Sequence, residues 1–255
     1  FVIMLYYENT FEFVCRLFGG MEINMKKISV FLVLALLCAQ SAYAAQFNDI
    51  NGHWAETVIN ELADKGIVNG TDTGAFMPNG TVTRAEYLKM IMNTVKIAPS
   101  ESGAADCLDA KGTDWYVGYL KSALEKGLIP QNMIRNYGAE IITDTDSDGN
   151  VVSSRVEYSG AFDGTNPISR EEMAFLTMGM YQYVLNANTM KGLAEKTDLS
   201  FTDDSEISEW AKSGVRLAAA NGFINGMEDG SFQPKSTATR AQAAAVISRV
   251  IEKVK

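Results

Sequence analysis

Three arginines stand at equivalent places in three similar segments of this 255-residue chain. Arg84, Arg170 and Arg240 each follow a Thr or Ser, and a Glu or Gln lies two residues after each arginine. A Thr or Ser with a Glu or Gln three residues later is the capping box that begins a helix. Each arginine therefore occupies the first position of a predicted helix.

A cation at this position faces the positive end of the helix dipole, which costs roughly a few tenths of a kcal/mol. Helix stability does not require it, so the arginines serve another purpose. One interpretation is an ion pair with a carboxylate of a neighbouring segment, such as Asp49 or Asp203. The other is that each arginine, beside the free N–H groups of a helix start, binds an anionic ligand. Both interpretations remain open on the residues alone.

The sequence contains few other residues typical of catalysis or metal binding. The single histidine, His53, leaves little room for a His-based metal site or a catalytic dyad. Acidic residues outnumber basic ones 31 to 22, which gives a formal charge of −9 and argues against nucleic acid as a partner. We expect no cofactor and no bound metal.

The arginines belong to internal repeats. Residues 54–86 align with residues 210–242 without a gap, and 13 of the 33 positions are identical. A third copy lies between them, because Trp115 to Gly127 matches Trp54 to Gly66 and Ser169-Arg170 matches Thr83-Arg84. The offset grows from 61 to 86 within this copy, so it carries an insertion of 25 residues.

Each repeat predicts a helix, a loop and a second helix. The first helix runs from Trp54, Trp115 or Trp210 to just before a glycine suited to a helix C-terminus. A glycine-rich loop follows, and the second helix begins at the capping box.

The insertion contains Asp144, Asp146, Asp148 and Gly149, which match the first half of an EF-hand calcium loop. Arg155, however, stands where that loop needs a bidentate Glu. Strand-like residues flank the Asp-Gly turn, so we favour a β-hairpin over a calcium site.

Residues 25–44 have the pattern of a signal peptide, with Lys26 and Lys27, a short apolar stretch and a small-residue cleavage pattern at Ala42 to Ala44. We therefore expect export and removal of this segment, with residues 1–24 an upstream extension of the gene model. Cys107 is then the one cysteine left in the mature chain, so no internal disulfide is expected.

The repeats resemble the S-layer homology (SLH) module, a bacterial cell-surface anchoring unit. The resemblance is carried by an F-x-D motif at Phe47 to Asp49 and Phe201 to Asp203, then W-A, a G-x-F-x-P loop and T-R-A-E at Thr83 to Glu86. It is weaker in the middle repeat, which lacks a clear F-x-D.

The resemblance implies a mainly α fold, in which three helix-loop-helix repeats form a pseudo-threefold arrangement around a central helical bundle. The expected repeats span residues 45–104, 105–187 and 188–255, with a small β-hairpin insertion at about 131–159 of the middle repeat.

It also implies a non-catalytic protein that binds an acidic cell-wall polymer through grooves between the modules. That polymer is a pyruvylated secondary polysaccharide or modified peptidoglycan. The ligand-binding residues carried over by resemblance are Arg84, Arg170, Arg240, Trp54, Trp115, Trp210, Gly70, Gly226, Asp49 and Asp203. Arginines would meet the acidic group, tryptophans would stack on a sugar ring, and glycines would allow close backbone approach. Each tryptophan could instead be a core residue of its first helix.

The expected location is the cell wall or cell surface, or the periplasmic side of a double-membraned envelope, without membrane insertion after signal cleavage. The alternatives are a self-assembling surface-layer or adhesin component and a cell-wall hydrolase. The hydrolase is disfavoured, because the repeats leave only the insertion for a catalytic domain.

Overall fold

The computed structural model describes residues 47–101, 106–185 and 200–255. The predicted upstream extension, residues 1–24, and the predicted signal peptide, residues 25–44, lie outside these ranges. The predicted repeat boundaries at 104–105 and 187–188 also lie outside them. The described ranges nevertheless contain every motif on which the repeats were recognised.

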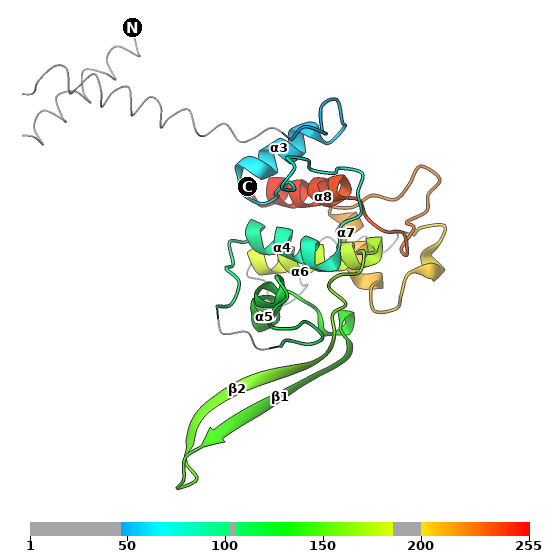
Figure 1. Cartoon of the computed structure of the whole chain (residues 1–255). Helices are drawn as coiled ribbons and strands as arrows, with labels where there is room; N and C mark the ends of the chain where they lie inside the picture. Colours follow the sequence, from blue (N-terminus) through cyan, green and yellow to red (C-terminus); the bar gives the residue numbers. More distant parts are fainter. Residues whose placement is uncertain (1–46, 102–105, 186–199) are drawn as a thin grey trace, which may run out of the picture. The chain divides into compact units, whose positions relative to one another are not determined.

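The regular structure of these ranges is mainly helical, as predicted, and the α-helices form three pairs. The short first helices are α3 (Glu56–Asp64), α5 (Val117–Glu125) and α7 (Lys212–Ala220). The second helices are α4 (Arg84–Thr94), α6 (Arg170–Val184) and α8 (Arg240–Lys253) (Figure 1). Two single 3-10 turns accompany them, η2 (Gln131–Met133) and η3 (Asp204–Glu206). Within the described ranges, no helix is both long and apolar enough to cross a membrane.

The helix ends follow from local sequence. Thr83, Ser169 and Thr239 all form complete capping boxes, so this prediction is confirmed in every copy. Gly66 and Gly127 follow α3 and α5 with φ of 68°, and Gly222 follows α7 with φ of 77°, the left-handed conformation that ends a helix. The first helices begin two residues after their tryptophans, so the predicted starts at Trp54, Trp115 and Trp210 were two residues early.

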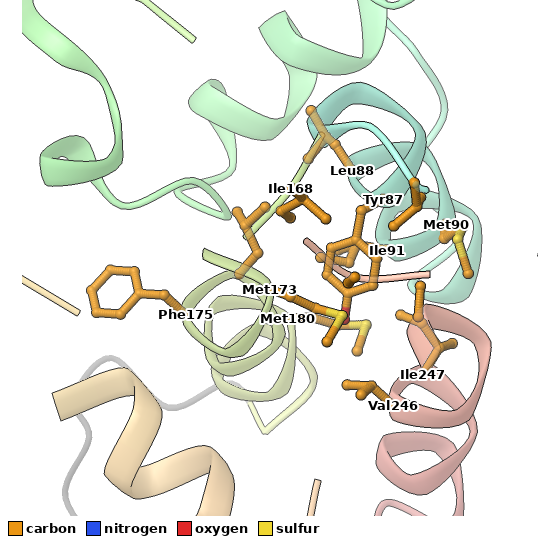
Figure 2. Packing of buried hydrophobic residues seen from close by; sticks show 14 of the residues in the cluster. Tyr87, Leu88, Met90, Ile91, Ile168, Met173, Phe175, Met180, Val246 and Ile247 are labelled. Carbon is orange, nitrogen blue, oxygen red and sulfur yellow. The ribbon is translucent and has the colours of Figure 1, made fainter. Parts of the chain in front are cut away.

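The three second helices form the centre of the fold, because α4, α6 and α8 each contact the other two. Their apolar side chains, among them Leu88, Ile91, Met180 and Ile247, are buried together (Figure 2). The cluster also contains a buried polar pair, in which the Tyr87 hydroxyl lies 2.7 Å from the Thr177 Oγ1. Thr177 uses its own proton to bond the Met173 carbonyl oxygen at 2.6 Å, so Tyr87 is the donor.

The short helices pack across the repeats. Helix α3 of the first repeat contacts α8 of the third, α5 of the middle repeat contacts α4 of the first, and α7 of the third contacts α6 of the middle repeat. Each short helix therefore buries its apolar face on the second helix of another repeat, and no repeat completes its own core.

A closed ring of backbone hydrogen bonds joins the three segments that precede the second helices. The Val82 N–H donates to the Ala238 carbonyl at 3.1 Å, the Ala238 N–H donates to Ile168 at 3.0 Å, and the Ile168 N–H donates back to Val82 at 2.9 Å. All three residues are fully buried. The ring fixes where the three helix starts, and hence the three arginines, lie relative to one another.

The predicted β-hairpin is present in the middle repeat. Strands β1 (Arg135–Thr145) and β2 (Val151–Ala161) pair antiparallel, with Ile141 opposite Val156. The turn is closed by Asp146, whose carboxylate accepts the backbone N–H groups of Asp148 and Asn150, both at 2.9 Å. Most of the hairpin is exposed, including 73% of Ile141.

The buried Tyr87–Thr177 pair gives an asymmetric prediction. Tyr87→Phe should lower the free energy of unfolding by only about 1 kcal/mol, because Thr177 keeps its own acceptor. Thr177→Val should cost more, about 2 kcal/mol, because it leaves the buried phenol without an acceptor. Urea unfolding of both variants measures the difference. Equal losses, or a larger loss for Tyr87→Phe, would contradict this assignment of donor and acceptor.

Candidate functional site

Each of the three arginines clamps its own repeat to another one. The Arg84 Nε donates to the Phe162 carbonyl at 2.6 Å, its Nη2 donates to the Met133 carbonyl at 3.1 Å, and its Nη1 bonds the Glu172 carboxylate. The guanidinium also lies 4.7 Å from the centre of the Phe162 ring. Only 5% of Arg84 is exposed, so this side chain is a buried connector between the first and middle repeats.

Arg240 repeats the pattern between the third and first repeats. Its Nε donates to the Phe76 carbonyl at 2.7 Å, its Nη2 donates to the Asn69 carbonyl at 2.9 Å, and its Nη1 lies 3.4 Å from a Glu86 oxygen.

Arg170 makes the same two backbone contacts between the middle and third repeats. It donates to the carbonyls of Phe232 and Asn225, both at 2.8 Å. In the described ranges, however, it forms no ion pair with any carboxylate. Burial lowers the pKa of Arg170, and the negative charge of Asp203 opposes that effect.

The arginine ion pairs differ from the expectation. They are made with capping-box glutamates, Glu172 and Glu86, instead of Asp49 or Asp203. The Asp49 carboxylate instead accepts the backbone N–H groups of Phe76 and Met77, both at 2.7 Å. Asp49 therefore binds the N–H group of Phe76, and Arg240 binds the carbonyl oxygen of the same residue. Asp203 holds Phe232 and Gln233 in the same way, again at 2.7 Å.

The pKa of Asp49 reflects this contact. Burial by itself would raise it, but the hydrogen bonds from the Phe76 and Met77 backbones and the charge of Arg240 outweigh that effect. The pKa of Asp49 consequently lies below its ordinary value, and the carboxylate is charged at neutral pH.

The helix starts offer no free N–H groups to a ligand, contrary to the anion-binding interpretation. The N–H groups of Arg84 and Ala85 donate to the Asn166 and Gly164 carbonyls at 2.9 and 2.8 Å. The equivalent groups of α6 and α8 donate to loop carbonyls in the same way. The physical reason is that the loop of another repeat packs directly over each helix start. Only the arginine side chains remain for an anion.

Asp109 is a further site residue, which was not among those predicted from the sequence. Its carboxylate accepts the N–H groups of Phe162 and Asp163 at 2.6 and 2.8 Å, so it is the middle-repeat counterpart of Asp49 and Asp203. Cys107 stands where the F-x-D motif has Phe, which hid the motif. The Asp located a few residues before Trp115 was the available signal. Burial raises the pKa of the Cys107 thiol to about 11.

The loop glycines allow a close approach, but the approaching group is an aromatic ring of the same repeat. A Cβ on Gly70 would lie 2.5 Å from the Phe47 ring, and one on Gly226 would lie 2.9 Å from the Phe201 ring. These glycines therefore pack the F-x-D phenylalanine beneath the loop.

A cavity of about 560 Å³, here called the Trp115 cavity, is formed by all three repeats. The first repeat supplies Gly70, Glu86 and Lys89, while Trp115 comes from the middle repeat and Arg240 from the third. The Lys89 Nζ lies 5.6 Å from the centre of the Trp115 ring, and 55% of Trp115 is exposed. The cavity thus presents a flat aromatic face beside two cations.

A smaller cavity of about 140 Å³, here called the Trp54 cavity, has the same construction. Trp54 comes from the first repeat, Arg170 from the middle one, and Asn225, Gln242 and Arg249 from the third. Trp54 is 65% exposed. Both cavities therefore combine a tryptophan and an arginine that are far apart in sequence.

The equivalent place in the middle repeat is filled. Phe175 occupies the α6 position that Lys89 and Ala245 occupy in α4 and α8, and its ring packs edge-on against Trp210 at 5.4 Å. Figure 2 shows Phe175 on the far side of α6 from Tyr87. A Cβ on Gly214 would lie 2.1 Å from the Phe175 ring, so glycine is needed there. Trp210 is therefore partly buried and packed against the core, whereas Trp54 and Trp115 are exposed.

Two regions of the chain, residues 46–88 and 200–244, match the family model described as the S-layer homology domain. They lie within the first and third repeats, and the middle repeat lies outside both. S-layer homology domains are cell-wall anchoring modules.

Several known proteins are similar to most of the chain. They include an amylopullulanase of Thermoanaerobacterium thermosulfurigenes, 34% identical over 83% of this chain, and the exoglucanase XynX of Acetivibrio thermocellus, 35% identical over 81%. The surface-layer 125 kDa protein of Lysinibacillus sphaericus is 28% identical over 84% of the chain. The chain spans only 10%, 16% and 16% of these proteins, respectively.

The buried ion pair of Arg84 predicts a large stability effect. Arg84→Ala should lower the free energy of unfolding by about 3 kcal/mol, because it leaves the Glu172 carboxylate and two carbonyls without their partner. Trp54→Ala, at an exposed site, should change it by less than about 1 kcal/mol. Chemical denaturation compares the two, and similar losses would argue against the clamp.

The contact between Phe175 and Gly214 predicts a reversal of sign. Gly214→Ala alone should destabilise the protein by about 1–3 kcal/mol, because its methyl group collides with the Phe175 ring. In a Phe175→Ala background the same change should stabilise it by up to about 1 kcal/mol, since alanine favours the helix. Unfolding of the four proteins in this cycle tests the prediction. Additive effects would show that the two positions do not touch.

Proposed function

We propose that the chain is a non-catalytic envelope protein of three S-layer homology modules. In this proposal, it binds an acidic cell-wall polymer non-covalently in grooves between the modules. The observation that carries the proposal is that the Trp115 and Trp54 cavities each join an exposed tryptophan of one repeat to an arginine of another. A flat aromatic face next to a guanidinium suits a sugar that carries an acidic group.

The cyclic packing supports a third module and a pseudo-threefold arrangement. The short helix of each repeat lies on the second helix of another, and the pattern closes from the third repeat to the first. The middle repeat also has the same arginine clamp, capping box and aspartate as the other two.

The similarity to known proteins gives independent support. The alignment with the amylopullulanase covers 211 residues, so 44 residues of this chain lie outside it. The expected middle repeat, residues 105–187, lies more than 44 residues from either end of the chain and therefore falls within that alignment. An alignment that spans the middle repeat supports the proposal of a third module, although the family model does not match this repeat.

The proposal assigns different parts to the candidate residues. Arg240 and Arg170 would meet the acidic group, and Trp115 and Trp54 would stack on the sugar ring. The other candidate residues would not contact the ligand but would shape the grooves, because each takes part in packing or holds a groove loop in place. They are Arg84, Trp210, Gly70, Gly226, Asp49 and Asp203.

Anchoring at the cell wall or cell surface follows from this function, and export would use the predicted signal peptide. The relatives named as enzymes share only 10% and 16% of their lengths with the chain. We propose that the shared part is their anchoring region, which keeps the assignment non-catalytic. Self-assembly as a surface-layer component is the second candidate, because the Lysinibacillus sphaericus relative is named as a surface-layer protein.

Binding to purified cell-wall sacculi of the source bacterium, before and after removal of the secondary polymer, tests the function. The chain should sediment with intact sacculi and lose most of its binding to stripped ones. Equal sedimentation with both preparations would exclude the polymer as the ligand. Assembly into ordered arrays without sacculi would favour the second candidate.

The exposed tryptophans provide a sharper prediction. Trp54→Ala and Trp115→Ala should each weaken binding to sacculi by roughly three- to tenfold, the value of an aromatic contact, without lowering the melting temperature. Trp210→Ala is the matched control, because it should lower the melting temperature through its lost contact with Phe175. If the Trp54, Trp115 double variant sediments like the parent, the cavities are not the binding sites.

A further inference from the structure

The three grooves differ at the last position of the capping box. Glu86 and Glu172 occupy it in the first and middle repeats, and Gln242 occupies it in the third. All three side chains accept the backbone N–H of their N-cap residue, so the helix start is equally satisfied in each copy. The replacement of Glu by Gln therefore changes the charge at this position but not the capping of the helix.

The glutamates neutralise the arginines that reach them. Glu172 bonds the Nη1 of Arg84, and Glu86 lies 3.4 Å from the Nη1 of Arg240. Gln242 has no charge to offer Arg170, and no other carboxylate of the described ranges forms an ion pair with it. Arg170 is nevertheless only 5% exposed, so its charge is buried, and the Asp203 carboxylate acts on it from beyond ion-pair distance. Such a cation strongly favours an incoming anion.

A second cation lies in the same cavity. Arg249 lines the Trp54 cavity, and its Nη1 donates to the Phe223 carbonyl at 2.9 Å. Its counterpart in α4 is the uncharged Asn93. None of the residues that line the Trp54 cavity is acidic, whereas Glu86 lines the Trp115 cavity. Both cavities are therefore lined by two cations, Arg170 and Arg249 in one and Arg240 and Lys89 in the other, but only the lining of the Trp115 cavity includes a carboxylate.

We propose that Gln242 makes the Trp54 cavity the principal anion site of the chain, by leaving Arg170 unpaired for the carboxylate of an acidic sugar. Arg249 adds a second charge to the site, and the sugar ring lies against Trp54. The Trp115 cavity is larger and weaker for anions, because Glu86 already occupies Arg240. This inference rests on the proposed function. It adds that the Trp54 cavity contributes most of the anion binding and that Gln242 determines this.

Gln242→Glu tests the inference with little risk to folding, because glutamate serves the same capping box at Glu86 and Glu172. Three probes are titrated calorimetrically: the pyruvate ketal of methyl glucoside, its uncharged methyl ester, and glucose 6-phosphate. Sedimentation with sacculi is measured in parallel. We expect Gln242→Glu to bind the ketal acid and the sacculi roughly tenfold more weakly, as for loss of a charge-assisted contact, with binding of the ester unchanged. Glucose 6-phosphate shows whether a phosphate replaces the carboxylate.

Two further variants complete the comparison. Glu86→Gln should free Arg240 and strengthen binding of the ketal acid at the Trp115 cavity. Glu172→Gln is the matched control, because Phe175 fills the groove that Arg84 would serve, and it should leave binding unchanged. Parent-like binding of acid and sacculi by Gln242→Glu would overturn the inference while leaving the proposed function intact. Failure of the parent chain to bind sacculi would instead overturn both.

Discussion

The first N–H groups of a helix have no acceptors within the helix, and in this fold each second helix obtains them from another repeat. The N–H groups of Arg240 and Ala241 donate to the carbonyls of Gly80 and Pro78, both at 2.9 Å, and the other two helix starts are satisfied in the same manner. A buried donor without an acceptor costs about 1–3 kcal/mol. Each repeat has two such donors, and the assembled fold satisfies all six of them with carbonyls of another repeat.

The arginines extend the same dependence to the side chains. Each guanidinium bonds two carbonyls of the repeat whose loop also caps its helix, and it lies over the phenylalanine of that loop. An aspartate fixes the opposite side of the same peptide segment. The residue type that was expected to serve a ligand thus first serves assembly. The surfaces left between the repeats are a consequence of that assembly, and they concentrate cations on a chain with an acidic balance.

The features that were predicted correctly from the sequence depend on local signals. The capping boxes at Thr83, Ser169 and Thr239, the glycines after the short helices and the Asp-Gly hairpin turn all depend on a few neighbouring residues, and all are present. Ion pairs between repeats are present for Arg84 and Arg240, but the named carboxylates were wrong, because the choice of Glu86 over Asp49 is made by packing between distant repeats. Asp109 was missed because Cys107 replaces the phenylalanine of its motif. The sequence does contain a signal that one groove is filled, because alignment of the repeats places Phe175 at the position of Lys89.

The clamp of Arg240 on the first repeat has a consequence for the order of folding. Its contacts with Phe76 and Asn69 join residues 164 and 171 positions apart, and the third repeat is synthesised after the other two. Contacts of such separation delay folding, because a long loop must close before they form. The Phe76 and Asn69 carbonyls of the first repeat remain without these partners until α8 has been synthesised. A chain truncated before α8 would lack the closing contacts, so the complete core forms only after α8 has been synthesised.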